Sequence, residues 1–232
     1  LFISNDQFLS ITSSLKVNNP IVLLSSLTNN RSLNKPSELE ICTNFNTKEC
    51  NLLFLGWLNK EGIYRKSLLK TLEALSICIH ERGKIMNLSI VGKPGDGVKI
   101  IEKFVEEYNL KRFVKFAFDV SQEEKNLYYI KSDLLVSPSY MEGFGNASLE
   151  AMSFGCPALV SKYGASSEVV GDSGYIINSI DKDSIADTLC IYEGLSVEEK
   201  KKMRIKSYNR AYNKFGFDQR LTRMRNLIFD RN

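Results

Sequence analysis

Residues 137–157 read SPSYMEGFGNASLEAMSFGCP, and this stretch decides the fold. The run just before it, Asp133-Leu134-Leu135-Val136, has the continuous apolar character of a strand that is covered on both faces of a sheet. A loop with two glycines follows, and then a segment of helical period that ends near Gly155. The stretch therefore predicts a strand, a tight glycine loop, a helix and the start of the next strand.

The glycine loop has the features of an anion site. We expect Gly143 and Gly145 to take positive φ and to let the backbone approach a ligand without interference from a Cβ atom. A helix that starts here leaves the N–H groups of Gly145, Asn146 and Ala147 without partners inside the helix. These groups would point at whatever occupies the loop, and helix N-termini favour negative charge.

Two carboxylates flank the loop. Glu142 lies before the predicted helix, and Glu150 lies about one turn inside it. We expect both to face one cleft at different depths. A carboxylate accepts hydrogen bonds only, and it can bind two neighbouring hydroxyls at once. A polyhydroxylated ligand that carries phosphate would suit the two carboxylates and the free amides.

Outward from this stretch, short apolar runs alternate with longer amphipathic segments. The predicted strands are 52–56, 88–91, 113–116, 134–137, 158–160 and 175–177. The predicted helices are 66–82, 98–108, 122–131, 146–154 and 185–192. This alternation is typical of an α/β fold, a Rossmann-like, doubly wound parallel sheet with right-handed crossovers. Ligands of such sheets bind beyond the carboxyl ends of the strands.

Composition divides the chain into three regions. Residues 1–50 contain no glycine and are interpreted as a connecting segment, whereas residues 51–199 carry the strand and helix alternation of the Rossmann-like domain. Residues 200–232 hold eleven basic and two acidic residues and are interpreted as a basic helical cap. A solvated helix face is the ordinary explanation of such a charge run. Contact with anionic lipid or with a nucleotide-bearing cleft is the alternative, and RNA binding is a weaker one.

The overall composition is that of an ordinary globular chain. The 232 residues are 43% hydrophobic and 25% charged, which excludes a disordered, collagen-like or disulfide-scaffold protein. A net charge of +4 is too small to indicate a nucleic acid partner. Five cysteines without a C-x-x-C pair favour a reducing cytoplasm. No apolar run reaches the roughly 18 residues of a spanning helix, and the start, which lacks the features of a signal peptide, suggests a fragment.

The segment that runs from Glu142 to Met152 resembles the E-x7-E signature of the group 1 family of retaining glycosyltransferases, which have the GT-B fold. Residues 53–56, 89–92, 115–118, 132–139 and 155–161 are similar to the strands of that family in the same order. The resemblance covers residues 51 to about 230. It implies the C-terminal, nucleotide-sugar-binding half of a GT-B fold, with residues 1–50 as a remnant of the acceptor domain.

The resemblance also implies a role for each residue of the site. Glu142 and Lys66 would be the catalytic residues, because Glu142 would bind sugar hydroxyls and Lys66 would meet the charge of the leaving diphosphate. Glu150 would take the ribose hydroxyls. The other donor-binding residues would be Arg65, Gly56 and the loop residues Gly143, Phe144, Gly145, Asn146 and Ala147.

The sequence departs from the family at one position. The family carries an arginine directly after the glycine of the first strand, whereas here Gly56 is followed by Trp57. Arg65 would replace that arginine, with Lys60 as a less favourable choice. Trp57 either stacks on the ligand or packs against the protein. The alternative for Arg65 and Lys66 is that both are surface cations.

Four other motifs are weaker. Asp181-Lys182-Asp183 spells the D-x-D of a metal site, but it reads better as an N-cap with an acidic first turn. The glycine-rich segment 92–97 fits no nucleotide-binding fingerprint and is expected to line the floor of the cleft. His80 is the only histidine and is expected on the surface near a helix C-terminus. Residues 146–148 form a glycosylation sequon whose place in the binding loop argues against modification.

These observations predict a glycosyltransferase that moves a sugar from a nucleotide to an acceptor hydroxyl without a metal or other cofactor. UDP is favoured over GDP, and the base is expected near residues 116–119. The acceptor would be a lipid-linked glycan of a bacterial surface polysaccharide, reached in the cytoplasm or at the inner face of the membrane by peripheral contact. The alternatives are a non-catalytic nucleotide-sugar-binding module and a nucleotide-sugar epimerase. We expect this chain alone to transfer little.

Overall fold

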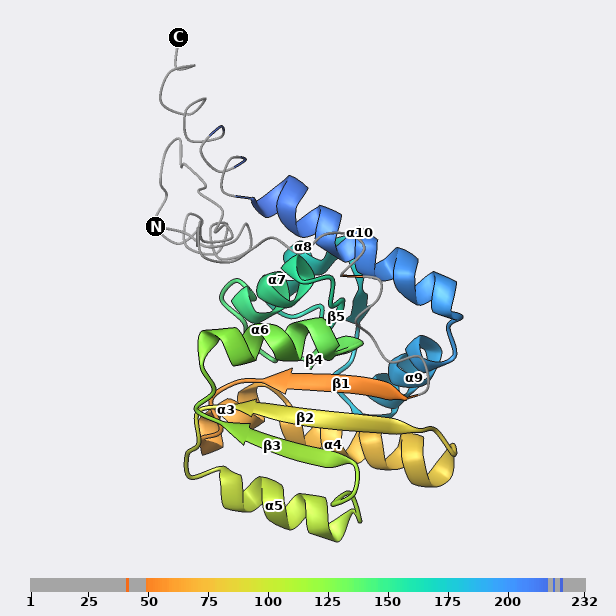
Figure 1. The fold of residues 1–232 in the computed structure, drawn as a ribbon. Coiled ribbons are helices and arrows are strands. Elements are labelled where there is room, and N and C mark those ends of the chain that lie inside the picture. Colours follow the sequence, from red (N-terminus) through yellow and green to blue (C-terminus); the bar gives the residue numbers. More distant parts are fainter. Residues whose placement is uncertain (1–40, 42–48, 217–218, 220–221, 223–232) are drawn as a thin grey trace.

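The computed structural model describes residue 41, residues 49–216 and residues 219 and 222 (Figure 1). Most of the predicted segment 1–50 lies outside the described residues, as does most of the basic C-terminal region beyond Gly216. Cys42 also lies outside them. The boundaries proposed for these two regions therefore stay predictions.

Six parallel strands form one sheet. They are β1 (Cys50–Leu55), β2 (Met86–Gly92), β3 (Val114–Phe118), β4 (Leu134–Ser137), β5 (Ala158–Ser161) and β6 (Tyr175–Ile177). Their order is β3-β2-β1-β4-β5-β6, in which β1 pairs with both β2 and β4. Figure 1 shows the arrowheads of β1, β2 and β3 at one edge, beside α3 (Lys60–Arg65). The six predicted strands are confirmed, and their ends differ from the prediction by at most two residues.

Helices cover both faces of the sheet, because successive side chains of each strand point to opposite sides. On β1, Leu52 and Phe54 join one buried cluster, whereas Leu53 joins the other. The first cluster is covered by α4 (Leu68–Ser76), α5 (Val98–Glu107) and α9 (Lys182–Glu193). The second is covered by α6 (Gln122–Lys131), α7 (Asn146–Ser153), α8 (Ser166–Val170) and α10 (Val197–Phe215). The predicted doubly wound α/β fold is confirmed.

The helix predicted over 66–82 is confirmed within two residues, since α4 and the turn that continues it span 68–81, but the helix that precedes it was not predicted. A separate helix, α3, ends at Arg65, and Ser67 is left-handed with a φ of 55° before α4 begins. The last turn, Ile77–Glu81, is π-helical. Apolar periodicity predicts this segment, and it gives no sign that the helix starts only after Ser67. The signal for α3 was its N-cap Asn59, whose Oδ1 accepts from the N–H of Gly62 at 2.8 Å.

The basic C-terminal region is not a uniformly solvated face. Arg204 of α10 is 0% exposed. Its guanidinium donates at 2.9, 2.8 and 3.1 Å to three backbone carbonyls, those of Ile41, Ser132 and Ile130. Arg210 donates to two carbonyls of α8, and Figure 1 shows α10 lying along this part of the molecule. Part of the positive charge thus fixes α10 to the domain.

Candidate functional site

The sheet changes direction between β1 and β4. The connection after β1 leads to β2 on one side, whereas the connection after β4 leads to β5 on the other. The carboxyl ends of two such strands border the crevice in which open α/β sheets bind ligands. Every residue of the predicted site lies in the segments that follow these two strands.

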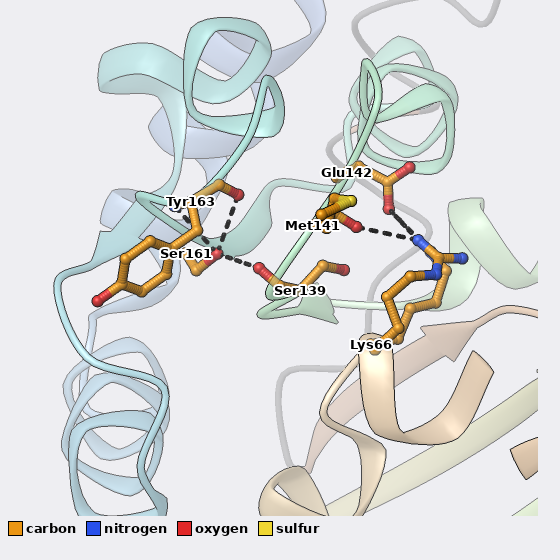
Figure 2. A network of polar contacts seen from close by, with 7 residues as sticks. Lys66, Ser139, Met141, Glu142, Ser161 and Tyr163 are labelled. Atoms are coloured by element: carbon orange, nitrogen blue, oxygen red, sulfur yellow. Dashed lines mark hydrogen bonds and ion pairs between the residues drawn. The ribbon is translucent and has the colours of Figure 1, made fainter. Parts of the chain in front are cut away.

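Glu142, after β4, contacts two cations at the C-terminal end of α3, the last residue Arg65 and the C-cap Lys66. Its Oε2 atom lies 3.3 Å from Nζ of Lys66 and 3.7 Å from Nη1 of Arg65. Arg65 also donates to the carbonyl of Met141 at 3.0 Å, and its own carbonyl accepts from the N–H of Tyr140 at 2.9 Å. Figure 2 shows the side chain of Lys66 extending toward Glu142. The structure thus brings Glu142, Lys66 and Arg65 together, although Glu142 lies 76 residues from Lys66 in the sequence.

The three charges differ in their access to solvent. The side chain of Lys66 is 10% exposed and that of Glu142 is 19% exposed, whereas that of Arg65 is 38% exposed. Charges this far from water need an ionic partner, because the cost of desolvation is otherwise uncompensated. An anionic ligand can provide that partner in place of Glu142. The cluster is therefore suited to exchange one negative group for another.

Gly56 has a role in this cluster that the sequence did not show. A Cβ atom at this position would lie 2.8 Å from Cδ of Lys66 and 3.3 Å from Cε. The aliphatic stem of Lys66 therefore crosses directly over Gly56. Gly92, at the end of β2, packs against the carbonyl of Gly56 just as closely, since a Cβ there would lie 1.7 Å from that oxygen. Glycine at residue 56 thus lets the lysine reach Glu142.

The loop that carries Glu142 is fixed from the side of α8. The N–H of Ala165 donates to the carbonyl of Glu142 at 3.1 Å. Gly145 is left-handed with a φ of 92°, as predicted, and a Cβ there would lie 2.6 Å from Oγ of Ser166. The positive φ expected at Gly143 is not found. At Gly145 the space is therefore needed for close packing against α8, and not only for approach of a ligand.

The start of α7 is open to a ligand. Gly145 occupies the N-cap position and no side chain caps the helix. Asn146 is exposed and Ala147 is half-buried, whereas Gly145 and Ser148 are buried. The side chain of Phe144 is buried, with its ring edge-on to that of Phe215 at 5.8 Å. Phe144 thus offers a ligand its backbone, whereas its ring belongs to the core.

Glu150 has a different set of partners. Its Oε2 atom lies 2.8 Å from Nζ of Lys125 and accepts from the hydroxyl of Tyr129 at 3.1 Å. Both partners come from α6, and burial together with the nearby Glu150 raises the pKa of Tyr129. The side chain of Glu150 is 40% exposed. Its contacts are those of a pair on a helix surface, which is the alternative to a ribose-binding role.

Aromatic and apolar side chains surround this edge of the sheet. Large exposed side chains follow the ends of β1, β3, β4 and β5, namely Trp57, Tyr64, Phe118, Tyr140, Met141 and Tyr163. Trp57 is 56% exposed and has Nζ of Lys93 at 5.9 Å from its ring centroid, so it is not packed in the core. The sequence analysis gave no separate role to Lys93 or Tyr140, although it placed Lys93 in the segment 92–97 expected at the cleft floor and Tyr140 in the stretch before the glycine loop. The order of the strands brings both residues to the same edge of the sheet.

The weaker motifs have structural explanations where the structure describes them. Asp181 caps α9, because its Oδ1 accepts from the N–H of Ser184 at 2.7 Å, and contacts of this kind with Ser179 and Ser184 lower its pKa to about 2. The predicted N-cap is confirmed. His80 is exposed and its Nε2 lies 3.2 Å from the carbonyl of Tyr108. Among the residues described, no three His, Cys, Asp or Glu side chains are grouped as metal ligands.

The family model described as "Glycosyl transferases group 1" matches residues 43–212 of the chain. The chain belongs to this family. The group 1 resemblance drawn from the Glu142 segment and the C-terminal, GT-B assignment are thereby confirmed.

The glycosyltransferase domain has named relatives. The O-antigen chain mannosyltransferase B of Escherichia coli is 30% identical over 122 residues, which are 53% of this chain and 32% of that protein. The O-antigen chain mannosyltransferase RfbU of Salmonella typhimurium is 35% identical over 98 residues, which are 42% of this chain and 28% of that protein. The chain therefore spans less than a third of the length of either relative.

Solved structures show the same fold. The structure of S. aureus TarM in complex with Fondaparinux, alpha-GlcNAc-glycerol and UDP matches with a TM-score of 0.78 at 20% identity. The match covers 98% of this chain and 43% of TarM.

Within the part of the chain that the structure describes, no helix is both long and apolar enough to cross a membrane.

Proposed function

We propose that this glycosyltransferase domain binds a nucleoside diphosphate sugar between the carboxyl ends of β1 and β4, and that the sugar is transferred to an acceptor hydroxyl with retention of configuration. The observation that carries the proposal is the convergence of Lys66 and Arg65 on Glu142, three residues before the uncapped start of α7. Two cations and a set of free amides are what a leaving diphosphate needs.

In this proposal the diphosphate takes over the cations that Glu142 now holds. Lys66 would contact a phosphate oxygen as a point charge, and Arg65 would bind the diphosphate through its accessible guanidinium. The amides of Gly145, Asn146 and Ala147 would hold the second phosphate at the helix start. Their stabilisation of the departing diphosphate would supply much of the rate, together with the positioning of the two substrates. No step requires a metal.

Glu142 would then bind sugar hydroxyls. Once Lys66 and Arg65 face phosphate, the carboxylate of Glu142 is free to accept from two neighbouring hydroxyls of the sugar. Glu150 would accept from the ribose hydroxyls while its second oxygen keeps the contact with Lys125. The base would lie near residues 116–119, where Asp119 is left-handed with a φ of 48° and its N–H donates to the carbonyl of Gly92 at 3.2 Å. Such backbone strain is common at functional sites.

The relatives support the finer part of the proposal. The two mannosyltransferases are named for the O-antigen chain, which favours a glycan of a bacterial surface polysaccharide as the acceptor. The TarM complex contains UDP, which favours UDP over GDP as the leaving group. A lipid-linked form of the glycan would bring the domain to the inner face of the membrane. The exposed lysines of α10 are available for that contact.

A panel of UDP, GDP, ADP and their sugars, measured by thermal shift and calorimetry, tests the proposal. We expect UDP compounds to bind best and Lys66→Ala to weaken their affinity about tenfold or more, because a partly buried charge-assisted contact is lost. Lys70→Ala is the matched control, since Lys70 lies one turn on and pairs with Glu73 at 2.9 Å. The proposal is wrong if no nucleotide binds, or if the two variants lose affinity equally.

A non-catalytic nucleotide-sugar module is the second candidate, and exposed Trp57 in place of the family's arginine favours it. The two candidates differ in turnover. A transferase releases UDP from the UDP-sugar in the presence of acceptor glycan, and Glu142→Ala abolishes that release. A module binds the donor but releases no UDP above background, either as wild type or as Glu142→Ala. An epimerase would instead return a different nucleotide sugar without an acceptor.

A further inference from the structure

Two cysteines that lie far apart in the sequence meet on the face of the sheet covered by α4 and α9. Sγ of Cys190, in α9, lies 3.5 Å from Sγ of Cys78, which is 112 residues away. Cys78 belongs to the π-helical turn Ile77–Glu81 that continues α4. A π turn is rare in proteins and is frequent at functional positions.

The two thiols have different surroundings. Cys78 is 0% exposed, and its thiol also lies 3.5 Å from the carbonyl of Ala186. Burial, followed by the contact with Cys190, raises the pKa of the Cys78 thiol. Cys190 is half-buried and therefore accessible to a small oxidant.

Positive charge lies next to the accessible thiol. Hydrogen bonds with Cys190 and Asp187 raise the pKa of the Arg82 guanidinium, and its Nη2 lies 2.7 Å from Oδ1 of Asp187. Lys84 lies close enough to Cys190 for their charges to interact. An adjacent cation stabilises a thiolate, which is the reactive form of cysteine. Glu193 lies on the same side and pairs with Lys84 at 2.7 Å, just as Asp187 pairs with Arg82.

We propose that Cys78 and Cys190 form a reversible oxidation site that closes into a disulfide between the end of the α4 helix and α9. Hydrogen peroxide is the class of oxidant that fits the half-buried thiol. The Cys190 thiolate attacks one peroxide oxygen, which breaks the O–O bond, gives a sulfenic acid and releases one water after proton transfer. The Cys78 sulfur then attacks the sulfenic sulfur, the S–O bond breaks, and a second water carries away the remaining thiol proton.

The balance is two thiols and one peroxide giving one disulfide and two waters. A disulfide bond is about 2.05 Å long, so the sulfurs must approach by about 1.5 Å from their present separation. The bond would close a loop between segments 112 residues apart and thereby restrict the unfolded chain. This inference is independent of the proposed function, since it uses no residue of the nucleotide site.

Oxidation of the 232-residue chain with hydrogen peroxide tests the inference directly. We expect free thiols to fall from five to three, and a non-reducing digest to contain one cross-linked peptide pair, Cys78 with Cys190. The midpoint of urea unfolding should rise after oxidation and return on treatment with dithiothreitol. Cys190→Ser, at the half-buried position, should abolish both the cross-link and the rise.

Cys156→Ser is the matched control, because Cys156 is 0% exposed and burial raises the pKa of its thiol to about 12. This variant should still form the cross-link, and circular dichroism checks that each variant is folded. Cys42→Ser removes the thiol that lies outside the described residues. The inference is overturned if Cys190 accumulates as sulfinic acid without a cross-link, if Cys50 or Cys42 is the partner, or if the disulfide joins two chains.

Discussion

The two ends of β4 use charged residues in opposite ways. At the amino end, Arg204 is completely buried and donates to three backbone carbonyls. Close by, the hydroxyl of Tyr192 donates to the carbonyl of Asp133 at 2.7 Å. At the carboxyl end, Glu142 is held at 3.3 Å by the nearly buried Lys66 and at 3.7 Å by the partly exposed Arg65.

This difference between the two ends of β4 separates residues that stabilise the fold from residues that can bind a ligand. Backbone carbonyls at the amino end cannot move away from Arg204 without unfolding the elements that carry them. The partners of Glu142 are flexible side chains, so a phosphate can replace the carboxylate without disturbing the fold. We therefore expect substitutions at the amino end of β4 to affect unfolding, and those at the carboxyl end to affect ligands.

The largest effect is expected from Arg204→Met. The change leaves three buried carbonyls without their donor, which should reduce the free energy of unfolding by about 3 to 5 kcal/mol. Lys202→Met, at an exposed position of the same helix, should change it by less than about 0.5 kcal/mol. Urea denaturation measures both. A loss below about 1 kcal/mol for Arg204→Met would contradict the structural role of the buried charge.

Asp133 should make stability depend on pH. Burial raises the pKa of its carboxyl from 3.8 to about 6, against the opposing effect of the Asn51 N–H, which donates to it at 2.7 Å. The folded state therefore binds this proton more tightly than the unfolded state. The resulting stabilisation is present below about pH 4 and is lost as the pH rises through 6, in total about 3 kcal/mol.

Asp133→Asn should remove that contribution. Urea unfolding at several pH values between 4 and 7 measures the slope of stability in both proteins. The free energy of unfolding of the wild type should fall across this range relative to that of the variant. The pH dependence that remains in the variant comes from all the other titrating groups. Equal slopes would show that the carboxyl of Asp133 does not titrate differently in the two states.

Glu150→Gln should affect recognition of the ribose. If Glu150 accepts from the ribose hydroxyls, wild type should prefer UDP to 2′-deoxy-UDP by about 1.5 kcal/mol, and the variant should lose most of that preference. Calorimetry with both nucleotides measures it. Lys125→Ala removes the ion pair of Glu150 on α6 but keeps the carboxylate, and it should preserve the preference. If Glu150→Gln keeps the preference for UDP over 2′-deoxy-UDP, Glu150 does not bind the ribose and serves only as a surface partner of α6.

The smallest effect is expected from Glu142→Gln on the binding of inorganic pyrophosphate. Removing the negative charge frees Lys66 and Arg65, so pyrophosphate should bind about fivefold more tightly, which is about 1 kcal/mol. The free energy of unfolding should change by no more than that. Weaker binding of pyrophosphate in this variant would show that the cations do not exchange Glu142 for phosphate.

Much of the fold could be predicted from short-range patterns. The strands β4 and β6 have the predicted bounds, because each is a short apolar run between turn residues, and β4 is buried along its whole length. The break at Ser67 could not be predicted, since a left-handed serine is dictated by its surroundings and not by its own preference. Asn59 could have indicated α3, but glycine at residue 62 obscured the helical pattern.

Short-range patterns also predicted part of the candidate site. The loop from Glu142 to Gly145 and the helix after it form one local unit, so residue types and spacing alone predicted the loop, the helix and a candidate anion site. The side chains that contact Glu142 and Glu150 lie in remote segments of the sequence. Lys66 and Arg65 reach Glu142 because β1 and β4 are neighbours in the sheet, whereas Lys125 and Tyr129 reach Glu150 because α6 packs on α7.

The sequence by itself determined the alternation of strands and helices and the glycine loop with its acids, since these depend on the preferences of residues a few positions apart. Only the tertiary structure decided which remote side chains meet. The burial of Arg204, the approach of Cys78 to Cys190 and the exposure of Trp57 all follow from strand order and helix packing. Contacts between segments separated by dozens of residues leave no local pattern, because any compatible strand order would satisfy the same periodicity.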